Sequence, residues 1–185
     1  MLIDITLSIT EEMLLQAKNN KNPQLEGHLG THFDVMDKEF PLEYTKRAGV
    51  IFDVSKSCDR EIETSDIDIE KVKPGMFVAF YSGYIEETDY CAPGYFKNHP
   101  QLSVSLIEAL AERKISIIAL DFGGIRRTPE HIPMDRYLAN KNIFVVENLC
   151  NMGKILEKTE YFTANTYPVK CQGVTGLPCR VICEI

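Results

Sequence analysis

Short apolar runs recur along the chain and alternate with more polar segments. Strand-like runs cover residues 2–7, 50–54, 76–80, 115–120, 143–146, 167–169 and 180–184. Apolar residues at helical spacing predict helices over residues 102–113 and 149–156. Helices placed between buried strands are typical of an α/β domain with a mixed sheet, and we expect one such domain over residues 1–185.

One stretch, residues 27–34 with the sequence G-H-L-G-T-H-F-D, is better suited to chemistry than to packing. It holds two of the four histidines, His28 and His32, and the carboxylate of Asp34. Imidazole and carboxylate groups are ligands for zinc or manganese, and three protein ligands leave a coordination position open. A straight strand would separate the two histidines by roughly 13 Å, and a regular helix would turn Asp34 away. The segment must therefore bend, which its two glycines permit.

The same stretch resembles the H-x-G-T-H-x-D opening of the cyclase family, metal-dependent hydrolases that include bacterial kynurenine formamidase and isatin hydrolase. Four further segments match family elements in the same order, namely residues 73–84, 98–103 (N-H-P-Q-L-S), 117–121 (I-I-A-L-D) and 144–149 (F-V-V-E-N-L). The resemblance implies the swivelling β/β/α fold. It also implies a divalent metal, zinc as the first expectation and manganese as the alternative, on His28, His32 and Asp34.

Two positions depart from the family pattern. The family has a further histidine shortly after the motif where this chain has Lys38, and a histidine twelve residues before the E-N-L glutamate where it has Asp135. His131 stands four residues too early for that second position. A lysine ammonium cannot be a metal ligand.

Charge accounting suggests what replaces the second ion. The charges of one divalent ion and the Lys38 ammonium balance those of Asp34, Asp135 and Glu147, so the net charge of the site is about zero. Two divalent ions against Asp34 and Glu147 would leave a net charge of about plus two, which is more costly to hold in a desolvated pocket. We therefore hypothesise that Lys38 occupies the second-metal position, held by Asp135 and Glu147, beside a single ion. The alternative is that Lys38 points to solvent and Asp135 starts a helix.

The resemblance implies hydrolysis of a small amide or cyclic amide, as in an arylformamidase, by a metal-activated water. Glu147 needs the least perturbed pKa to act as the base, with Asp135 or a lysine as alternatives. A catalytically altered module that binds a metal or metabolite, and a metal-dependent dehydratase or lyase, remain the other interpretations. A base within about 3 Å of the open metal position favours an enzyme over a binding module.

Aromatic and basic residues supply candidates for substrate contact. Tyr84, Tyr90 and Phe96 lie where family members cover the substrate, so they are candidates for an aromatic wall, with core or dimer contacts as the alternative. Arg126 and Arg127 are either partners for a substrate carboxylate or surface charges.

Composition and charge limit the classes of binding partner and the location that we expect. A net charge of -7, with no basic cluster, argues against nucleic acid and anionic membranes, and leaves a small-molecule substrate. No apolar run approaches the roughly 20 residues that span a bilayer, and the N-terminus lacks a basic start, so we expect a cytoplasmic protein. The six cysteines form no C-x-x-C pair, which argues against a disulfide scaffold. Resemblance makes a homodimer or larger homo-oligomer the default.

Overall fold

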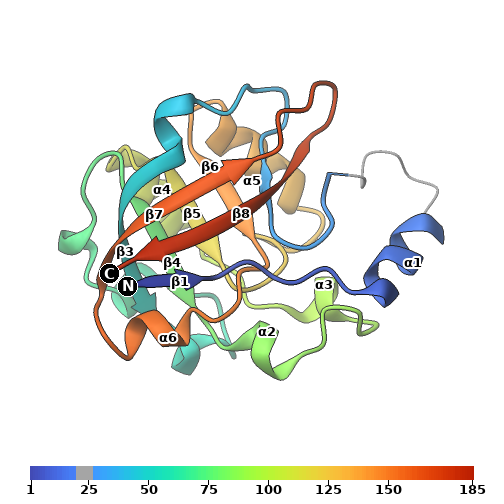
Figure 1. The fold of residues 1–185 in the computed structure, drawn as a ribbon. Coiled ribbons are helices and arrows are strands. Elements are labelled where there is room, and N and C mark those ends of the chain that lie inside the picture. Colours follow the sequence, from blue (N-terminus) through green and yellow to red (C-terminus); the bar gives the residue numbers. More distant parts are fainter. Residues whose placement is uncertain (20–26) are drawn as a thin grey trace.

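The computed structural model describes residues 1–19 and 27–185, and in this part of the chain a mixed eight-stranded sheet forms the centre. The strands run in the order β1-β8-β2-β6-β5-β4-β3-β7. Their bounds are β1 Leu2–Asp4, β2 His32–Asp34, β3 Lys46–Asp53, β4 Phe77–Tyr81, β5 Ile117–Leu120, β6 Phe144–Glu147, β7 Tyr161–Pro168 and β8 Gly176–Glu184. Because β7 also pairs with β8, the sheet closes into a barrel-like ring (Figure 1).

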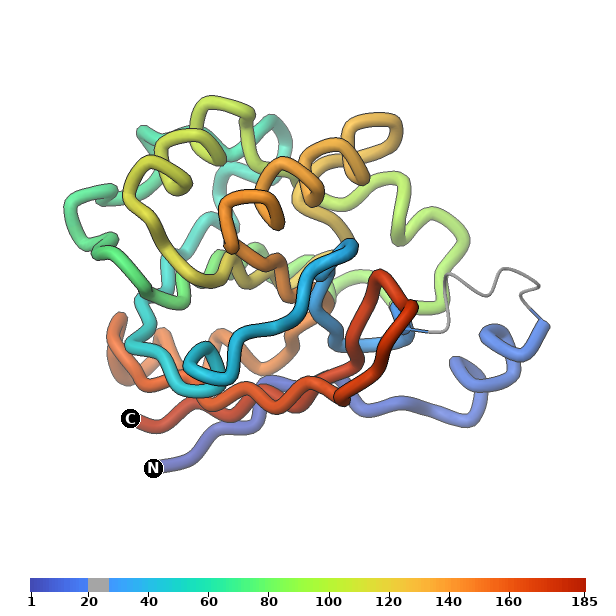
Figure 2. Tube along the Cα trace, turned by 90° about the horizontal axis from the view of Figure 1, so that it is seen from above, coloured from blue at the N-terminus to red at the C-terminus, as the bar shows by residue number. Residues whose placement is uncertain are grey.

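Strands β3, β4, β5 and β6 are parallel neighbours, and helices cover their outer face. The main helices are α4 (Val104–Glu112) and α5 (His131–Ala139), which lie on one side of the barrel while both termini lie on the other (Figures 1 and 2). The Ser103 hydroxyl caps α4 by accepting a hydrogen bond from the Leu106 amide at 3.2 Å. Strands buried on both faces are expected to be apolar throughout, as β5 is.

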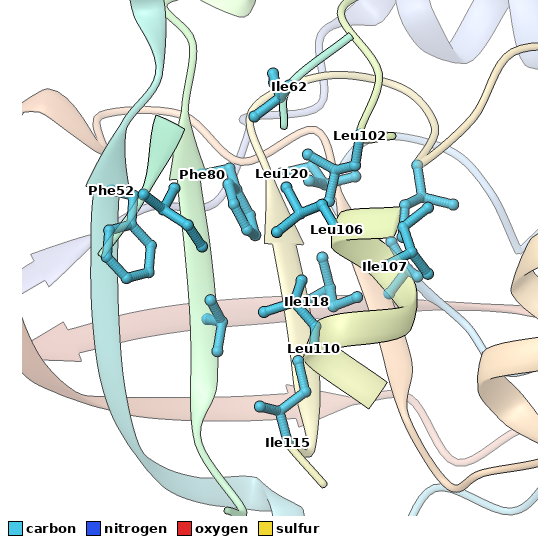
Figure 3. Packing of buried hydrophobic residues seen from close by; sticks show 14 of the residues in the cluster. Phe52, Ile62, Phe80, Leu102, Leu106, Ile107, Leu110, Ile115, Ile118 and Leu120 are labelled. Atoms are coloured by element: carbon cyan, nitrogen blue, oxygen red, sulfur yellow. The ribbon is translucent and has the colours of Figure 1, made fainter. Parts of the chain in front are cut away.

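The hydrophobic core has two parts, one between the strands and the helices and one inside the barrel, and the same strands contribute side chains to both. Alternate strand residues such as Phe80, Ile118 and Leu120 point outward and pack against Leu106 and Leu110 of α4 (Figure 3). The intervening residues fill the barrel, and examples are Phe33, Phe77, Ala119, Phe144 and Val146. The period-two alternation therefore decides which side chains of β2 and β6 face the helices.

Smaller elements connect these layers. They are α1 (Glu11–Asn19), α2 (Tyr84–Glu87), α3 (Tyr95–Asn98), α6 (Gly153–Leu156) and 3₁₀ turns over Leu42–Thr45, Ser55–Ser57, Thr64–Asp66 and Ile69–Lys71. Among the described helices, none combines the length and hydropathy that crossing a membrane would require. The cysteines are free thiols, and Cys183 is the buried one.

The α/β class, the mixed sheet and most predicted strands are confirmed. The predicted helix over residues 102–113 is α4, whereas the one over 149–156 is only the short α6. Strand β7 begins well before the predicted residues 167–169. Helix α5 was not predicted, although it supplies one wall of the site described below.

Candidate metal centre

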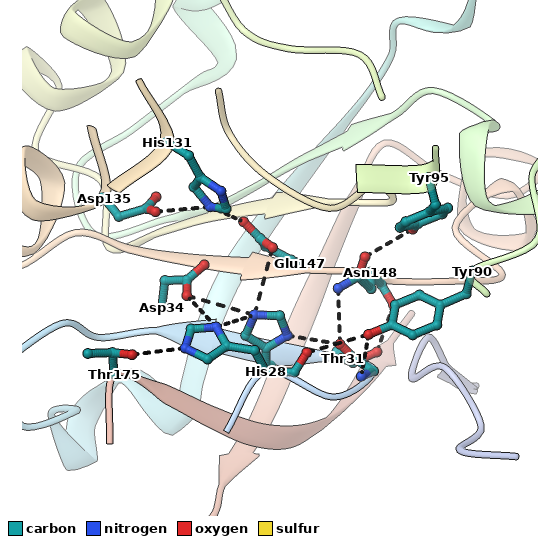
Figure 4. A network of polar contacts seen from close by, with 12 residues as sticks. His28, Thr31, Asp34, Tyr90, Tyr95, His131, Asp135, Glu147, Asn148 and Thr175 are labelled. Atoms are coloured by element: carbon teal, nitrogen blue, oxygen red, sulfur yellow. Dashed lines mark hydrogen bonds and ion pairs between the residues drawn. The ribbon is translucent and has the colours of Figure 1, made fainter. Parts of the chain in front are cut away.

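The pairing of β2 with β6 collects the candidate site on the outer face of the barrel, beneath α5. His32 lies directly opposite Glu147 in the antiparallel register, and the two side chains therefore share a face. Phe33, between His32 and Asp34, points into the barrel instead. Helix α5 lies over β6, and its residues His131 and Asp135 are one turn apart, with His131 between the carboxylates of Asp135 and Glu147 (Figure 4).

The three ligands predicted from the motif converge on one point. His28 Nδ1 lies 3.1 Å from His32 Nε2 and 3.1 Å from Asp34 Oδ1, and His32 Nε2 lies 3.7 Å from Asp34 Oδ1. Ligands about 2.0–2.1 Å from a tetrahedral ion lie about 3.3 Å from one another. The bend that allows this occurs at Gly30, whose φ is +69°. The predicted bend and the predicted proximity of the three side chains are therefore confirmed.

Each of the two histidines has a second polar partner that orients its ring. His32 Nδ1 donates to the Gly30 carbonyl at 2.9 Å, which leaves the Nε2 lone pair facing the point of convergence. The Gly30 carbonyl also accepts from the Asn148 amide at 3.1 Å. His28 Nε2 lies 2.9 Å from the Thr175 hydroxyl, in the segment that leads into β8 (Figure 4). Such partners fix the tautomer and orientation of metal-binding imidazoles.

A second group of possible ligands adjoins the first and shares Asp34 with it. Ligand atoms of Asp34, His131 and Asp135 all lie within 4.8 Å of one another. His131 Nε2 lies 3.1 Å from Asp135 Oδ2 and 3.2 Å from Glu147 Oε1. Glu147 Oε2 lies 3.7 Å from His32 Nε2, so this carboxylate stands between both groups.

The buried carboxylates fit a site for divalent cations. Asp34, Asp135 and Glu147 are each no more than 3% exposed. Asp34 Oδ2 and Asp135 Oδ1 have no hydrogen-bond or ion-pair partner among the described residues, and Asp135 Oδ2 and Glu147 Oε1 have only their ion pairs with His131. Buried carboxylate oxygens are normally hydrogen-bonded, paired or bound to a metal. Three carboxylates and three imidazoles, divided over two adjoining groups, are a donor set that zinc or manganese accepts.

The pKa values show how strongly these groups interact. Burial raises the pKa of Asp135 to about 7, with a further contribution from the negative charge of Asp34. Burial and the same neighbouring charge hold the pKa of Glu147 well above its usual range. Burial would lower the pKa of His131, but the carboxylates of Asp135 and Glu147 outweigh it and raise the pKa to about 12. The cluster therefore favours a cation between α5 and β6.

The hypothesis that Lys38 supplies this cation is wrong. Its ammonium lies 4.0 Å from Asp37, which is its one ion-pair partner among the described residues, and 35% of its side chain is exposed. Met36 takes a φ of 55°, and the Lys38 amide donates to the Val35 carbonyl at 2.9 Å. After this tight turn Lys38 makes no ion pair with Asp135 or Glu147, although Asp37 beside it lies 3.9 Å from Arg136 of α5. Lys38 instead lines an open groove of about 1110 Å³ beside the β7–β8 connection.

The position intended for Lys38 is taken by His131. His131 stands four residues before the position expected from the family pattern. Because four residues make about one helical turn, His131 and Asp135 share a face of α5. The expectation of a single metal position therefore gives way to two adjoining ligand groups. The alternative for Lys38, that it points toward solvent, agrees with its exposure, whereas its second part, that Asp135 starts a helix, is wrong, since Asp135 lies inside α5 and is buried.

The predicted aromatic residues gather in one cluster beside the motif. Tyr90 contacts the motif backbone, since its hydroxyl accepts from the Gly30 amide at 3.0 Å. Tyr84 donates to the Tyr95 carbonyl at 2.9 Å and packs on that ring. Phe96 contacts Tyr90 edge-on and is 52% exposed. A role of these residues in substrate binding stays a prediction.

The two arginines are placed by structural contacts. Arg126 is 5% exposed and pairs with Glu61 and Glu130. Arg127 donates through Nε to the His99 carbonyl at 2.7 Å. Arg126 is thus neither a surface charge nor free for a substrate carboxylate.

Comparisons with known proteins agree with this fold. The family model "Putative cyclase" matches residues 3–125. A protein described as "potential metal-dependent hydrolase with cyclase activity" has a similar structure, with 21% identity, a TM-score of 0.78, and coverage of 99% of this chain and 96% of its own. A predicted metal-dependent hydrolase from Bacillus stearothermophilus is 20% identical, with a TM-score of 0.75 and coverage of 99% and 97%.

Isatin hydrolase A from Labrenzia aggregata, bound to benzyl benzoate, is 19% identical, with a TM-score of 0.72 and coverage of 85% of this chain and 73% of its own. At these identities the likeness concerns the fold. A search of curated protein sequences returned no match.

Proposed function

The chain belongs to the cyclase family, and we propose that it is a metal-dependent hydrolase that cleaves the C–N bond of a small-molecule amide or cyclic amide. The observation that carries the proposal is the convergence of two adjoining ligand groups on buried carboxylates, of which Asp34 Oδ2 and Asp135 Oδ1 lack any polar partner among the described residues. Such an arrangement is costly to the fold unless cations complete it.

We assign two cation positions. His28, His32 and Asp34 hold the first, and Asp34, His131 and Asp135 hold the second, with Glu147 beside it. Zinc is the first expectation and manganese the alternative, because both accept imidazole and carboxylate ligands. When bound, a divalent cation supplies a Lewis acid that polarises a carbonyl and makes water a nucleophile near neutral pH.

The protein's own groups handle the proton. Glu147 lies between the two ligand groups, with Oε2 facing His32 and Oε1 facing His131. This position suits a base that takes a proton from the attacking water and returns it to the leaving nitrogen as the C–N bond breaks. Asp135 is the alternative base. Tyr90 and Phe96 offer an apolar wall to a planar substrate, and the isatin hydrolase structures suggest aryl and cyclic amides as the first compounds to assay.

The alternative, a catalytically altered module that binds a metal or metabolite, is less well supported than the hydrolase. It depended on the absence of both second-site histidines, and His131 supplies one imidazole at that position. No feature of the site favours a dehydratase or lyase over a hydrolase. Product analysis would separate the two, because hydrolysis opens a cyclic amide to an amino acid whereas a lyase forms a carbon–carbon double bond.

Metal content per chain and amide hydrolysis, measured on the same untagged preparations, test the proposal. We expect about two equivalents of metal in the parent, about one in His131→Ala and essentially none in Asp34→Asn. Lys38→Ala is the matched control and should keep both ions and its activity. A folded parent that retains no metal after supplementation with zinc or manganese would overturn the proposal.

The family resemblance also leads us to propose a homodimer or larger homo-oligomer with a cytoplasmic location. Light scattering on the purified protein tests the first part. A mass of about twice the 21.0 kDa chain is expected for a dimer, and a monomer mass at all concentrations would contradict it.

A further inference from the structure

A hydroxyl far from the motif contacts the candidate centre. Thr175 lies between β7 and β8, and its Oγ1 is 2.9 Å from His28 Nε2. The same residue's carbonyl accepts from the amides of Val35 and Met36 at 2.9 and 3.2 Å, directly after Asp34. Thr175 therefore touches the motif at both ends of the ligand triad, although 147 positions separate it from His28.

The two motif histidines would present opposite ring nitrogens to an ion. His32 directs Nε2 to the centre, because its Nδ1 donates to the Gly30 carbonyl. His28 directs Nδ1 to the centre, since that atom lies 3.1 Å from Asp34 Oδ1. A carbonyl can only accept, so the tautomer of His32 is settled by Gly30. The tautomer of His28 depends on Thr175, whose hydroxyl both donates and accepts.

We propose that Thr175 is a positioning residue of the metal centre, which holds His28 as an Nδ1 ligand by accepting a hydrogen bond from Nε2–H. The inference rests on the proposed function, because it assigns a role toward the cation proposed above. Without an ion, Nδ1–H of His28 can face Asp34 while Nε2 accepts from the hydroxyl. With Nδ1 committed to an ion, the ring proton lies on Nε2 and the hydroxyl accepts it.

The start of β8 packs closely on one side of the His28 ring, whereas another part of this side chain is exposed to solvent. A Cβ on Gly176 would lie 2.7 Å from both His28 Nε2 and the Gly27 carbonyl oxygen, so the beginning of β8 packs directly on this ring. The His28 side chain is 20% exposed, compared with 3% for His32. His28 is thus the ligand least fixed by the core, and its orientation depends most on a specific hydrogen bond.

Zinc affinity, measured by competition with a chelator, tests the role of Thr175. Thr175→Val keeps the shape of the side chain and removes the hydroxyl, and we expect zinc binding to weaken by about 10–100-fold, as for other lost partners of metal-binding histidines. Thr175→Ser should restore affinity close to that of the parent. Thr166→Val is the matched control, because Thr166 also donates a side-chain hydrogen bond, to the Tyr44 carbonyl at 3.2 Å, from the adjoining strand and away from the centre.

Nitrogen NMR of the histidine rings in zinc-loaded protein gives a second measurement that a merely structural role would not move. The parent should show His28 with a protonated Nε2 and a metal-bound Nδ1, and Thr175→Val should lose the protected Nε2–H signal. Equal zinc affinity and unchanged ring signals in parent and Thr175→Val would overturn the inference alone. Absence of zinc binding by the folded parent would overturn the proposed function, and this inference with it.

Discussion

At the scale of single residues, Glu147 is the group on which the proposed chemistry depends most. We expect Glu147→Gln to lower kcat/KM for amide hydrolysis by about 10²–10⁴-fold, the usual contribution of a general acid–base group. The amide has nearly the same shape as the carboxylate but cannot take up a proton. Metal content measured alongside, with Asp135→Asn as a comparison, separates loss of the base from loss of an ion. A metal-loaded Glu147→Gln protein with parental activity would exclude Glu147 as the base.

Asp135 gives a prediction about pH and stability. Its pKa in the folded protein is raised to about 7, mainly by burial, so the folded state binds this proton more tightly than the unfolded state does. The resulting stabilisation is fully present below the unfolded value of 3.8 and is lost as pH rises toward about 7. We expect the free energy of unfolding of metal-free protein to fall over this window, less steeply in Asp135→Asn. Equal slopes in urea titrations of both proteins would contradict the assignment.

Much of the first ligand group could be predicted from the sequence, because His28, His32 and Asp34 lie within one short bent segment. The second group could not, because it depends on how α5 is placed over β6. Counting back from Glu147 pointed to Asp135 and missed His131, which a helical reading with four-residue spacing would have found. Lys38 was misplaced because a left-handed residue, Met36, turns the chain directly after Asp34.

At the scale of elements, the motif segment and the start of β8 are held together by two glycines. A Cβ on Gly27 would lie 2.0 Å from the Gly176 carbonyl oxygen, which is backbone and cannot move aside alone. We therefore expect Gly27→Ala to destabilise the fold by about 1–3 kcal/mol, as overpacking does, and to weaken zinc binding through the displaced His28. Urea denaturation and chelator competition measure the two effects.

Gly153→Ala is the matched control for this change. Gly153 begins α6, and its Cβ would meet Tyr81 at an ordinary 3.4 Å, so we expect a change between neutral and about 1 kcal/mol stabilising. If Gly27→Ala were as stable as Gly153→Ala and bound zinc like the parent, the close packing of β8 on the motif would have no energetic role.

The sequence indicated elements well where side chains were apolar on both faces and poorly elsewhere. Strands β4 and β5 are continuous apolar runs and were predicted nearly to the residue. Strand β7 buries Phe162, Ala164 and Thr166 on one face only, so its first half did not stand out. Helix α5 carries a buried Asp135 on the face that points to the site, and this polar residue weakens the apolar pattern. A polar residue that belongs to the candidate site therefore made this helix hard to recognise from its apolar pattern.

For the whole molecule, the proposed ions would join elements that the chain brings together only by folding. The ligands come from the motif and β2 and from α5, the proposed base comes from β6, and the last two elements meet β2 through register and helix packing. An ion that binds the folded state alone stabilises it by about 2.7 kcal/mol at a concentration 100 times its Kd. For a chain of this size that corresponds to a rise in Tm of about 5–11 °C.

Because two ions are proposed, we expect chelation to lower the Tm of the parent by at least that amount and added zinc to restore it. Asp34→Asn removes the shared ligand, so its Tm should not respond to chelator or zinc. Lys38→Ala lies outside both ligand groups and should respond like the parent. A parent Tm that is the same with and without bound zinc would mean that the folded state has no preference for the ion. The buried carboxylates would then have to be compensated by protonation, which the pH dependence of Asp135→Asn would reveal.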